Sequence, residues 1–139
     1  MTTVNTHYTV NDQISIIGDP FGKRKRKVLV NGSTEIRVDR REFLVLVVLA
    51  EECGAFLSIE YILEKITAIN EAFNRLNHRL EEECMFWPYP CQCDVYAAVK
   101  RLRTKLNANG GKAELLESGG RAKGYRLTLP SKNVELSLE

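Results

Sequence analysis

The sequence has little of what an enzyme or a membrane protein needs. It contains two histidines, His7 and His78, which lie far apart, and no glycine-rich phosphate loop followed by Lys-Ser or Lys-Thr. No serine or cysteine stands beside an obvious general base. No apolar run approaches the roughly eighteen residues of a membrane-spanning helix, and the amino terminus lacks an apolar signal core. These absences argue against an enzyme, and they predict a cytoplasmic protein that does not enter a membrane.

The chain has four cysteines, Cys53, Cys84, Cys91 and Cys93. In a cytoplasmic protein we expect reduced thiols rather than a disulfide framework. Cys84, Cys91 and Cys93, together with His78, offer four ligands for zinc. Their spacing lacks the close C-x2-C pair of common structural zinc sites. The spacing therefore favours small buried or loop cysteines over a zinc site, and we expect no metal and no cofactor.

Charge is distributed unevenly, although the net charge is only +2. Residues 94–126 contain eight lysines and arginines against three acids, whereas residues 67–93 contain two arginines against four glutamates. Such segregation is expected when one face of a protein binds an anion and another face does not.

The segment Asp94–Leu106, DVYAAVKRLRTKL, carries four cations and no acid after its first residue. Its apolar residues recur at helical spacing and predict one buried stripe, formed by Val95, Val99, Leu102 and Leu106. We expect a helix over residues 94–107, with Asp94 as its cap. Its outward face would hold Ala97, Lys100, Arg101 and Thr104.

The first 66 residues predict a small sheet followed by two helices. Three short β-branched runs within residues 13–39 predict an antiparallel sheet. Asp39, with Glu42 three residues later, matches the capping box that begins a helix, and Gly54 matches its end. Ser58 repeats the start signal for a second helix.

The rest of the chain predicts an insert and a hairpin. Residues 67–93 place Ile69, Phe73, Leu76 and Leu80 at helical spacing, and the sequence MFWPYPCQC then interrupts the pattern. We interpret this insert as a further helix and an irregular loop. Residues 113–129 predict two strands around a basic, glycine-rich turn. The expected organisation is α+β: a flexible amino terminus (1–12), one domain (13–129) and a tail (130–139).

Three runs together resemble the winged-helix DNA-binding domain of OmpR/PhoB-type response regulators. They are VDRREFLVLVVLAEECGAFLSIEYILEKI, VYAAVKRLRTKL and GRAKGYRL, in that order. The resemblance covers roughly residues 13–129, and the paired RLR and GYR make it fairly specific. It implies a winged helix-turn-helix with an amino-terminal antiparallel sheet, a three-helix core and a carboxy-terminal hairpin, the wing.

The resemblance also implies roles for individual residues. A recognition helix over 94–107 would lie in the major groove, and a wing over 118–126 would enter the minor groove. Arg121 matches the wing arginine of the minor groove, and Lys123 would bind a phosphate. Gly124, Tyr125 and Arg126 are expected to be mainly structural, with the glycine permitting a close approach and the tyrosine packing under the wing. The residues expected to contact bases or phosphates from the recognition helix are Ala97, whose methyl group suits thymine, and Lys100, Arg101, Arg103 and Thr104.

Three features depart from the family pattern and leave the base preference open. Ala98 offers only a methyl group where relatives often carry a polar reader, and Tyr96 stands where an acid is usual. The pair Gly119-Gly120 makes a looser wing. The chain also begins almost directly at the predicted sheet, without the receiver domain of two-component phosphorelay systems, so that a stand-alone regulator and a fragment are both open.

The sequence thus predicts a sequence-specific DNA-binding transcriptional regulator, with double-stranded DNA as its partner. Further candidate partners are RNA polymerase or a regulatory protein, and a second copy of the chain on DNA. The alternative is a protein-interaction module on a winged-helix scaffold that uses the 67–93 insert. In that alternative the partner would bind the aromatic side chains of Phe86, Trp87 and Tyr89, since aromatic residues dominate interface energetics.

Overall fold

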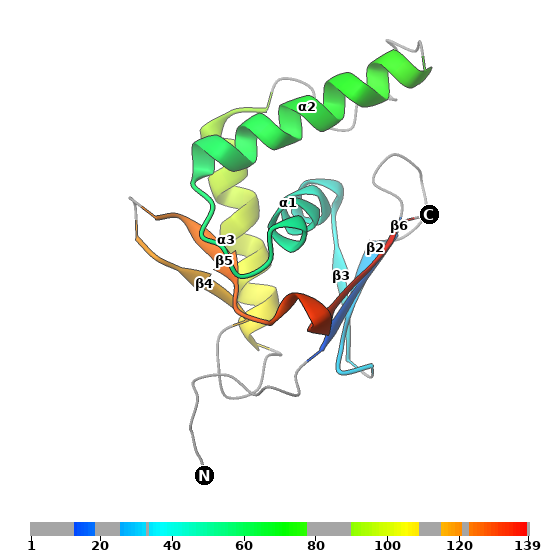
Figure 1. The fold of residues 1–139 in the computed structure, drawn as a ribbon, viewed down its shortest axis with the longest axis vertical. Coiled ribbons are helices and arrows are strands. Elements are labelled where there is room, and N and C mark those ends of the chain that lie inside the picture. The colour runs from blue at the N-terminus through cyan, green and yellow to red at the C-terminus, as the bar shows by residue number, and fades with distance from the viewer. Residues whose placement is uncertain are drawn as a thin grey trace.

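The computed structural model describes residues 13–18, 26–32, 34–77, 90–108, 115–120 and 123–138. The order of elements is three strands, three helices, a two-stranded hairpin and a final strand. Figure 1 shows the helix α1 (Arg40–Glu51) between the main sheet and the helix α3 (Gln92–Ala108), with the hairpin beside α3. This α+β arrangement is consistent with a winged helix. None of the helices that the structure describes is both long and apolar enough to cross a membrane.

The main sheet has four strands in the order β3-β2-β1-β6. The strands β1 (Ile14–Gly18), β2 (Arg26–Val30) and β3 (Thr34–Val38) form the predicted antiparallel meander. Its register aligns Ile16 with Val28 and Val28 with Ile36, and all three side chains are buried. Because side chains alternate along a strand, this register turns one apolar face of the sheet toward the helices.

The fourth strand, β6 (Val134–Leu138), lies in the segment that the sequence analysis leaves as a tail. It pairs in parallel with β1, and Val134 and Leu136 pack against the core. The alternation Val-Glu-Leu-Ser-Leu is typical of a half-buried strand. The folded region therefore extends past residue 129, to the end of β6.

The helix α1 begins with the predicted capping box. The Asp39 carboxylate accepts a hydrogen bond from the Glu42 backbone N–H (2.8 Å), and the Glu42 carboxylate accepts one from the Asp39 N–H (2.9 Å). The helix packs against β2, β3 and β6 on one side and against α2 and α3 on the other. Each residue from Phe43 to Leu49 is therefore buried, which explains the dense apolar run.

The helix α2 (Ile59–Asn77) begins where predicted, with the Ser58 hydroxyl accepting a hydrogen bond from the Tyr61 N–H (3.1 Å). It then continues without a break for 19 residues. The first part of the expected insert, residues 67–77, therefore extends α2 instead of forming a separate helix. The rest of the insert up to residue 89 lies outside the described residues.

The helix α3 begins at Gln92, two residues before the expected start. The backbone N–H of Val95 bonds the carbonyl of Cys91 (3.1 Å), so Asp94 lies within the first turn and is not the cap. After α3, the strands β4 (Leu116–Ser118) and β5 (Tyr125–Leu127) form the predicted antiparallel hairpin. This hairpin is called the wing below.

Candidate nucleic-acid interface

The buried stripe of α3 is the predicted one, with one addition. Val95, Val99, Leu102 and Leu106 are fully buried, and so is Ala98. Because Ala98 packs in the core, it is not a position from which a side chain reads DNA. This corrects the comparison of Ala98 with a polar reader in related domains.

The outward side of α3 carries small or uncharged residues around one lysine. Ala97 is half-buried, while Lys100 and Thr104 are exposed. The Thr104 hydroxyl donates a hydrogen bond to the Lys100 carbonyl one turn earlier (3.1 Å), and its oxygen remains an acceptor. Within the described residues, Lys100 forms no ion pair with a carboxylate. Its ammonium is therefore available to an external anion.

Two further cations of α3 are held by the start of α1. The buried carboxylate of Glu42 accepts hydrogen bonds from Lys105 Nζ (2.6 Å) and from Arg101 Nε (3.3 Å). Arg101 also lies 3.5 Å from the Asp39 carboxylate, and Lys105 donates to the Arg37 carbonyl (3.1 Å). Glu42 thus serves the α1 cap and both cations at once, and it fixes the orientation of α3 relative to α1.

The opposite side of α3 is joined to the wing. The Asn107 side-chain oxygen accepts hydrogen bonds from the N–H groups of Leu115 (2.9 Å) and Leu116 (3.1 Å), and its amide donates to the Leu116 carbonyl (3.2 Å). The half-buried Arg103 lies close enough to Tyr125 for its charge to influence the hydroxyl. These contacts fix the angle between α3 and the wing.

The wing is also tied to the chain between α1 and α2. Leu57 and Tyr125 exchange two backbone hydrogen bonds (2.8 and 2.9 Å), which form a short bridge beside β5. Gly124 adopts a φ of +92°, and a Cβ atom there would lie 1.9 Å from the Leu57 carbonyl oxygen. Only glycine fits this approach. The resemblance therefore predicted the structural role of Gly124 correctly.

The two wing glycines, Gly119 and Gly120, differ in their surroundings. A Cβ atom on Gly119 would lie 2.6 Å from the Phe56 ring, whereas one on Gly120 would meet nothing within 4 Å. The Gly119 N–H bonds the Gly124 carbonyl (2.8 Å), and the Gly124 N–H bonds the Gly120 carbonyl (3.0 Å). These bonds hold the described ends of the wing turn together, so the expectation of a looser wing finds no support there.

Two wing cations, Arg126 and Lys123, lie over the Phe56 ring. The guanidinium of Arg126 lies 4.5 Å from the ring centroid and its Nε bonds the Glu117 carboxylate (2.7 Å). The Lys123 ammonium lies 5.8 Å from the same centroid and forms no ion pair with a described carboxylate. Arg126 is therefore held within the protein, whereas the exposed Lys123 can reach an external anion.

The chain can be compared with known proteins. A scan against protein-family models and a search of curated proteins find no match. Among solved structures, the chain is similar to the DNA-binding domain of E. coli CadC, with 16% sequence identity and a TM-score of 0.49. The similarity covers 75% of this chain and 79% of that chain. At this identity and score, the functional argument rests on the residues of this chain alone.

Several predicted residues lie outside the described part of the chain. Arg121 belongs to this group, and so do the candidate partner-binding residues Phe86, Trp87 and Tyr89. Their roles stay predictions. Among the described residues, no three histidine, cysteine or acidic side chains gather as metal ligands would.

Sequence reasoning missed a groove between α3 and the wing. Gln92 and Tyr96 of α3 line it on one side, and Ser118 and Tyr125 of the wing line it on the other. Burial raises the pKa of the Tyr125 hydroxyl and the neighbouring Tyr96 raises it further, while Arg103 and Ser118 oppose the shift. The Tyr125 hydroxyl is therefore a hydrogen-bond donor throughout the neutral pH range. The aromatic residue at position 96, noted as a departure from the family pattern, was the available signal for this groove.

Proposed function

We propose that this chain is a DNA-binding domain of a transcriptional regulator, with α3 in the major groove and the wing in the adjacent minor groove. The observation that carries the proposal is the pair of available cations, Lys100 on α3 and Lys123 on the wing, on two elements that border one groove. The start of α1 holds two other cations of α3, Arg101 and Lys105, through Glu42. We therefore assign the phosphate contacts first to Lys100 and Lys123.

The outward side of α3 suits close contact with a duplex. The major groove of DNA is about 12 Å wide and admits one α-helix. Ala97 and Thr104 are small, so they leave room for base edges, while Lys100 between them reaches a phosphate or a guanine. Ala97 would contact a thymine methyl group, and the Thr104 oxygen would accept a hydrogen bond.

The ion pairs change the role that we assign to Arg101. Its guanidinium bonds Glu42 and lies beside Asp39, so its first task is to hold α3 against α1. Arg103 is half-buried, and its charge lowers the pKa of the Tyr125 hydroxyl, so we assign it to a phosphate near that hydroxyl. Base readout by α3 then falls mainly to Ala97, Lys100 and Thr104.

The wing supplies the second contact. Lys123 would bind a phosphate, and Arg121 would enter the minor groove, where a narrow A·T-rich segment concentrates negative potential. The open space around Gly120 allows the backbone to approach the sugar edge. Sequence preference would thus come partly from groove shape.

A salt titration tests this proposal. Fluorescence anisotropy with genomic duplex fragments, measured between 50 and 200 mM salt, gives the slope of log K against log salt, which is about −0.9 per phosphate contact. We expect Lys100→Ala to weaken binding to all fragments and to reduce the slope by about one unit. Lys27→Ala is the matched control, because Lys27 lies on the main sheet and pairs with Glu35 (3.6 Å).

Two results would overturn the proposal. A folded protein that binds no duplex at low salt would favour the interaction module that uses the 67–93 insert. Equal slopes for the parent, Lys100→Ala and Lys27→Ala would show that α3 is not the element in contact with phosphates.

A further inference from the structure

The groove between α3 and the wing has a volume of about 620 Å³ and is open to one side. If α3 occupies the major groove and the wing the adjacent minor groove, the sugar-phosphate strand that separates these two grooves must pass between the two elements. The groove lies where that strand would run. Its occupant is therefore set by the proposed function, on which this inference rests.

The groove wall is rich in uncharged hydrogen-bonding groups. The Tyr96 and Tyr125 phenols, the Ser118 hydroxyl and the Gln92 amide line it, together with the backbone of Gly120 and Gly124. Phenol, hydroxyl and amide groups all donate hydrogen bonds to phosphate oxygens. The glycines carry no side chain that would keep the strand away.

Tyr96 is the side chain best placed to meet the strand. It is 51% exposed, while Val95 and Val99 of the buried stripe hold α3 against the core. One turn further along α3 lies the exposed Lys100. The Tyr96 ring therefore lies at the edge of the outward side of α3, next to the wing.

We propose that Tyr96 binds a backbone phosphate of the DNA strand that crosses the groove, through its phenolic O–H, and packs its ring against the adjoining deoxyribose. The contact carries no charge, so it adds affinity and register without releasing a counterion. Lys100, in contrast, contributes through charge. The two residues are therefore separable by their salt dependence.

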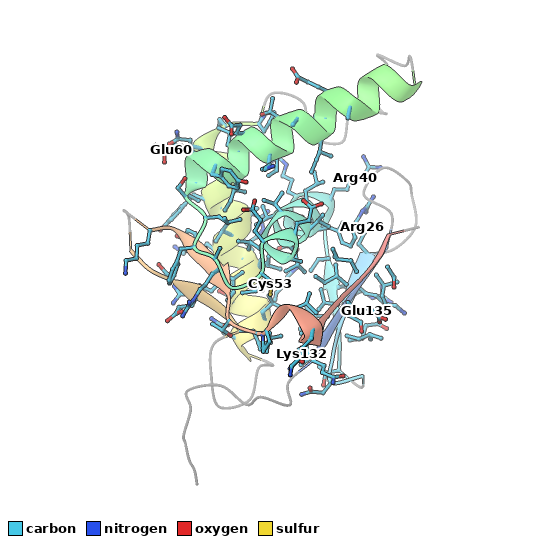
Figure 2. The ribbon with its side chains drawn as sticks, viewed as in Figure 1. Arg26, Arg40, Cys53, Glu60, Lys132 and Glu135 are labelled. Atoms are coloured by element: carbon cyan, nitrogen blue, oxygen red, sulfur yellow. The ribbon has the colours of Figure 1, made fainter. Side chains whose placement is uncertain are left out.

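The groove wall also carries an acid, Glu60, whose charge provides a second test. Glu60, in the first turn of α2, lines the groove and is exposed (Figure 2). Its carboxylate repels a phosphate within the roughly 8 Å over which charges act at physiological salt. Glu64, one turn later on α2, is also exposed but does not line the groove; it lines only the neighbouring hollow, which Glu60 and Gln92 share. The two glutamates therefore form a matched pair.

The test compares Tyr96→Phe with Lys100→Ala in the same salt titration. We expect Tyr96→Phe to lower affinity about tenfold, since a hydrogen bond to a charged group is worth roughly that factor. The salt slope should stay that of the parent, whereas Lys100→Ala reduces it by about one unit. Glu60→Gln should tighten binding at low salt more than Glu64→Gln does, and this difference should shrink as salt rises.

The outcomes separate this inference from the proposed function. If the parent and Lys100→Ala behave as expected but Tyr96→Phe binds as tightly as the parent, the phosphate contact of Tyr96 is refuted and the proposed function stands. If the parent binds no duplex, both fail. Equal effects of Glu60→Gln and Glu64→Gln would show that the strand does not run through the groove.

Discussion

Replacement of Glu42 by alanine tests how α1 positions α3. The Glu42 side chain is 1% exposed and accepts hydrogen bonds from the Asp39 N–H, Lys105 and Arg101. The alanine variant loses the reciprocal half of the capping box, which costs about 1 kcal/mol. The two cations are 46% and 39% exposed and regain water, so each lost ion pair costs only about 0.5–1 kcal/mol.

The lost packing of the Glu42 stem adds roughly 1 kcal/mol, which brings the total to about 3–4 kcal/mol. For a domain of this size, 1 kcal/mol shifts the melting temperature by roughly 4 °C, so we expect a decrease of about 12–16 °C. Glu42→Gln keeps the volume and an acceptor oxygen and should lose about half as much. Circular dichroism melts measure both shifts.

Lys27→Ala serves as the control for the loss of a surface ion pair, because the Lys27–Glu35 pair is exposed on both sides. It should change stability by less than about 0.5 kcal/mol. A melting temperature of Glu42→Ala within a few degrees of the parent would refute the reasoning. It would show that Arg101 and Lys105 do not depend on the buried carboxylate.

Two further predictions concern single positions. Gly124→Ala should destabilise the fold by about 2–4 kcal/mol, as measured by chemical denaturation. Gly124 has a positive φ, and a methyl group there would collide with the Leu57 carbonyl. An unchanged denaturation midpoint would contradict the bridge between the wing and Leu57. Cys53 should react with iodoacetamide more slowly than the exposed Cys93, as measured by peptide mass mapping. Burial raises the pKa of the Cys53 thiol, and the thiol also donates a hydrogen bond to the Leu129 carbonyl (3.0 Å). Equal rates would show that this environment opens in solution.

Local signals in the sequence predicted most of the fold. The capping box at Asp39 and the start of α2 at Ser58 depend on contacts within three residues, so their spacing alone indicated them. The parallel pairing of β6 with β1 joins segments about 120 residues apart, and no local pattern specifies which strand a short apolar alternation will join. Local pattern alone therefore predicts residues 130–139 as a tail, although they contain β6.

The candidate site was harder to predict, for a physical reason. Helical spacing shows which way a Cα–Cβ bond points, but a long side chain can bend toward a neighbouring element. The spacing predicts that Arg101 faces outward, yet its guanidinium forms ion pairs with Glu42 of α1 and with the cap residue Asp39. The groove beside Tyr96 arises from the packing of α3 against the wing, which the one-dimensional pattern does not contain.

The most direct test of the account is to map the DNA-contacting face by NMR. We predict that addition of a duplex at low salt shifts the backbone amide signals of Lys100 and Thr104 on α3 and of Lys123 on the wing, while those of Lys27 and Glu35 on the main sheet stay in place. Amide shifts centred on the main sheet, or no shifts at all, would contradict the claim that α3 and the wing form the DNA-binding face.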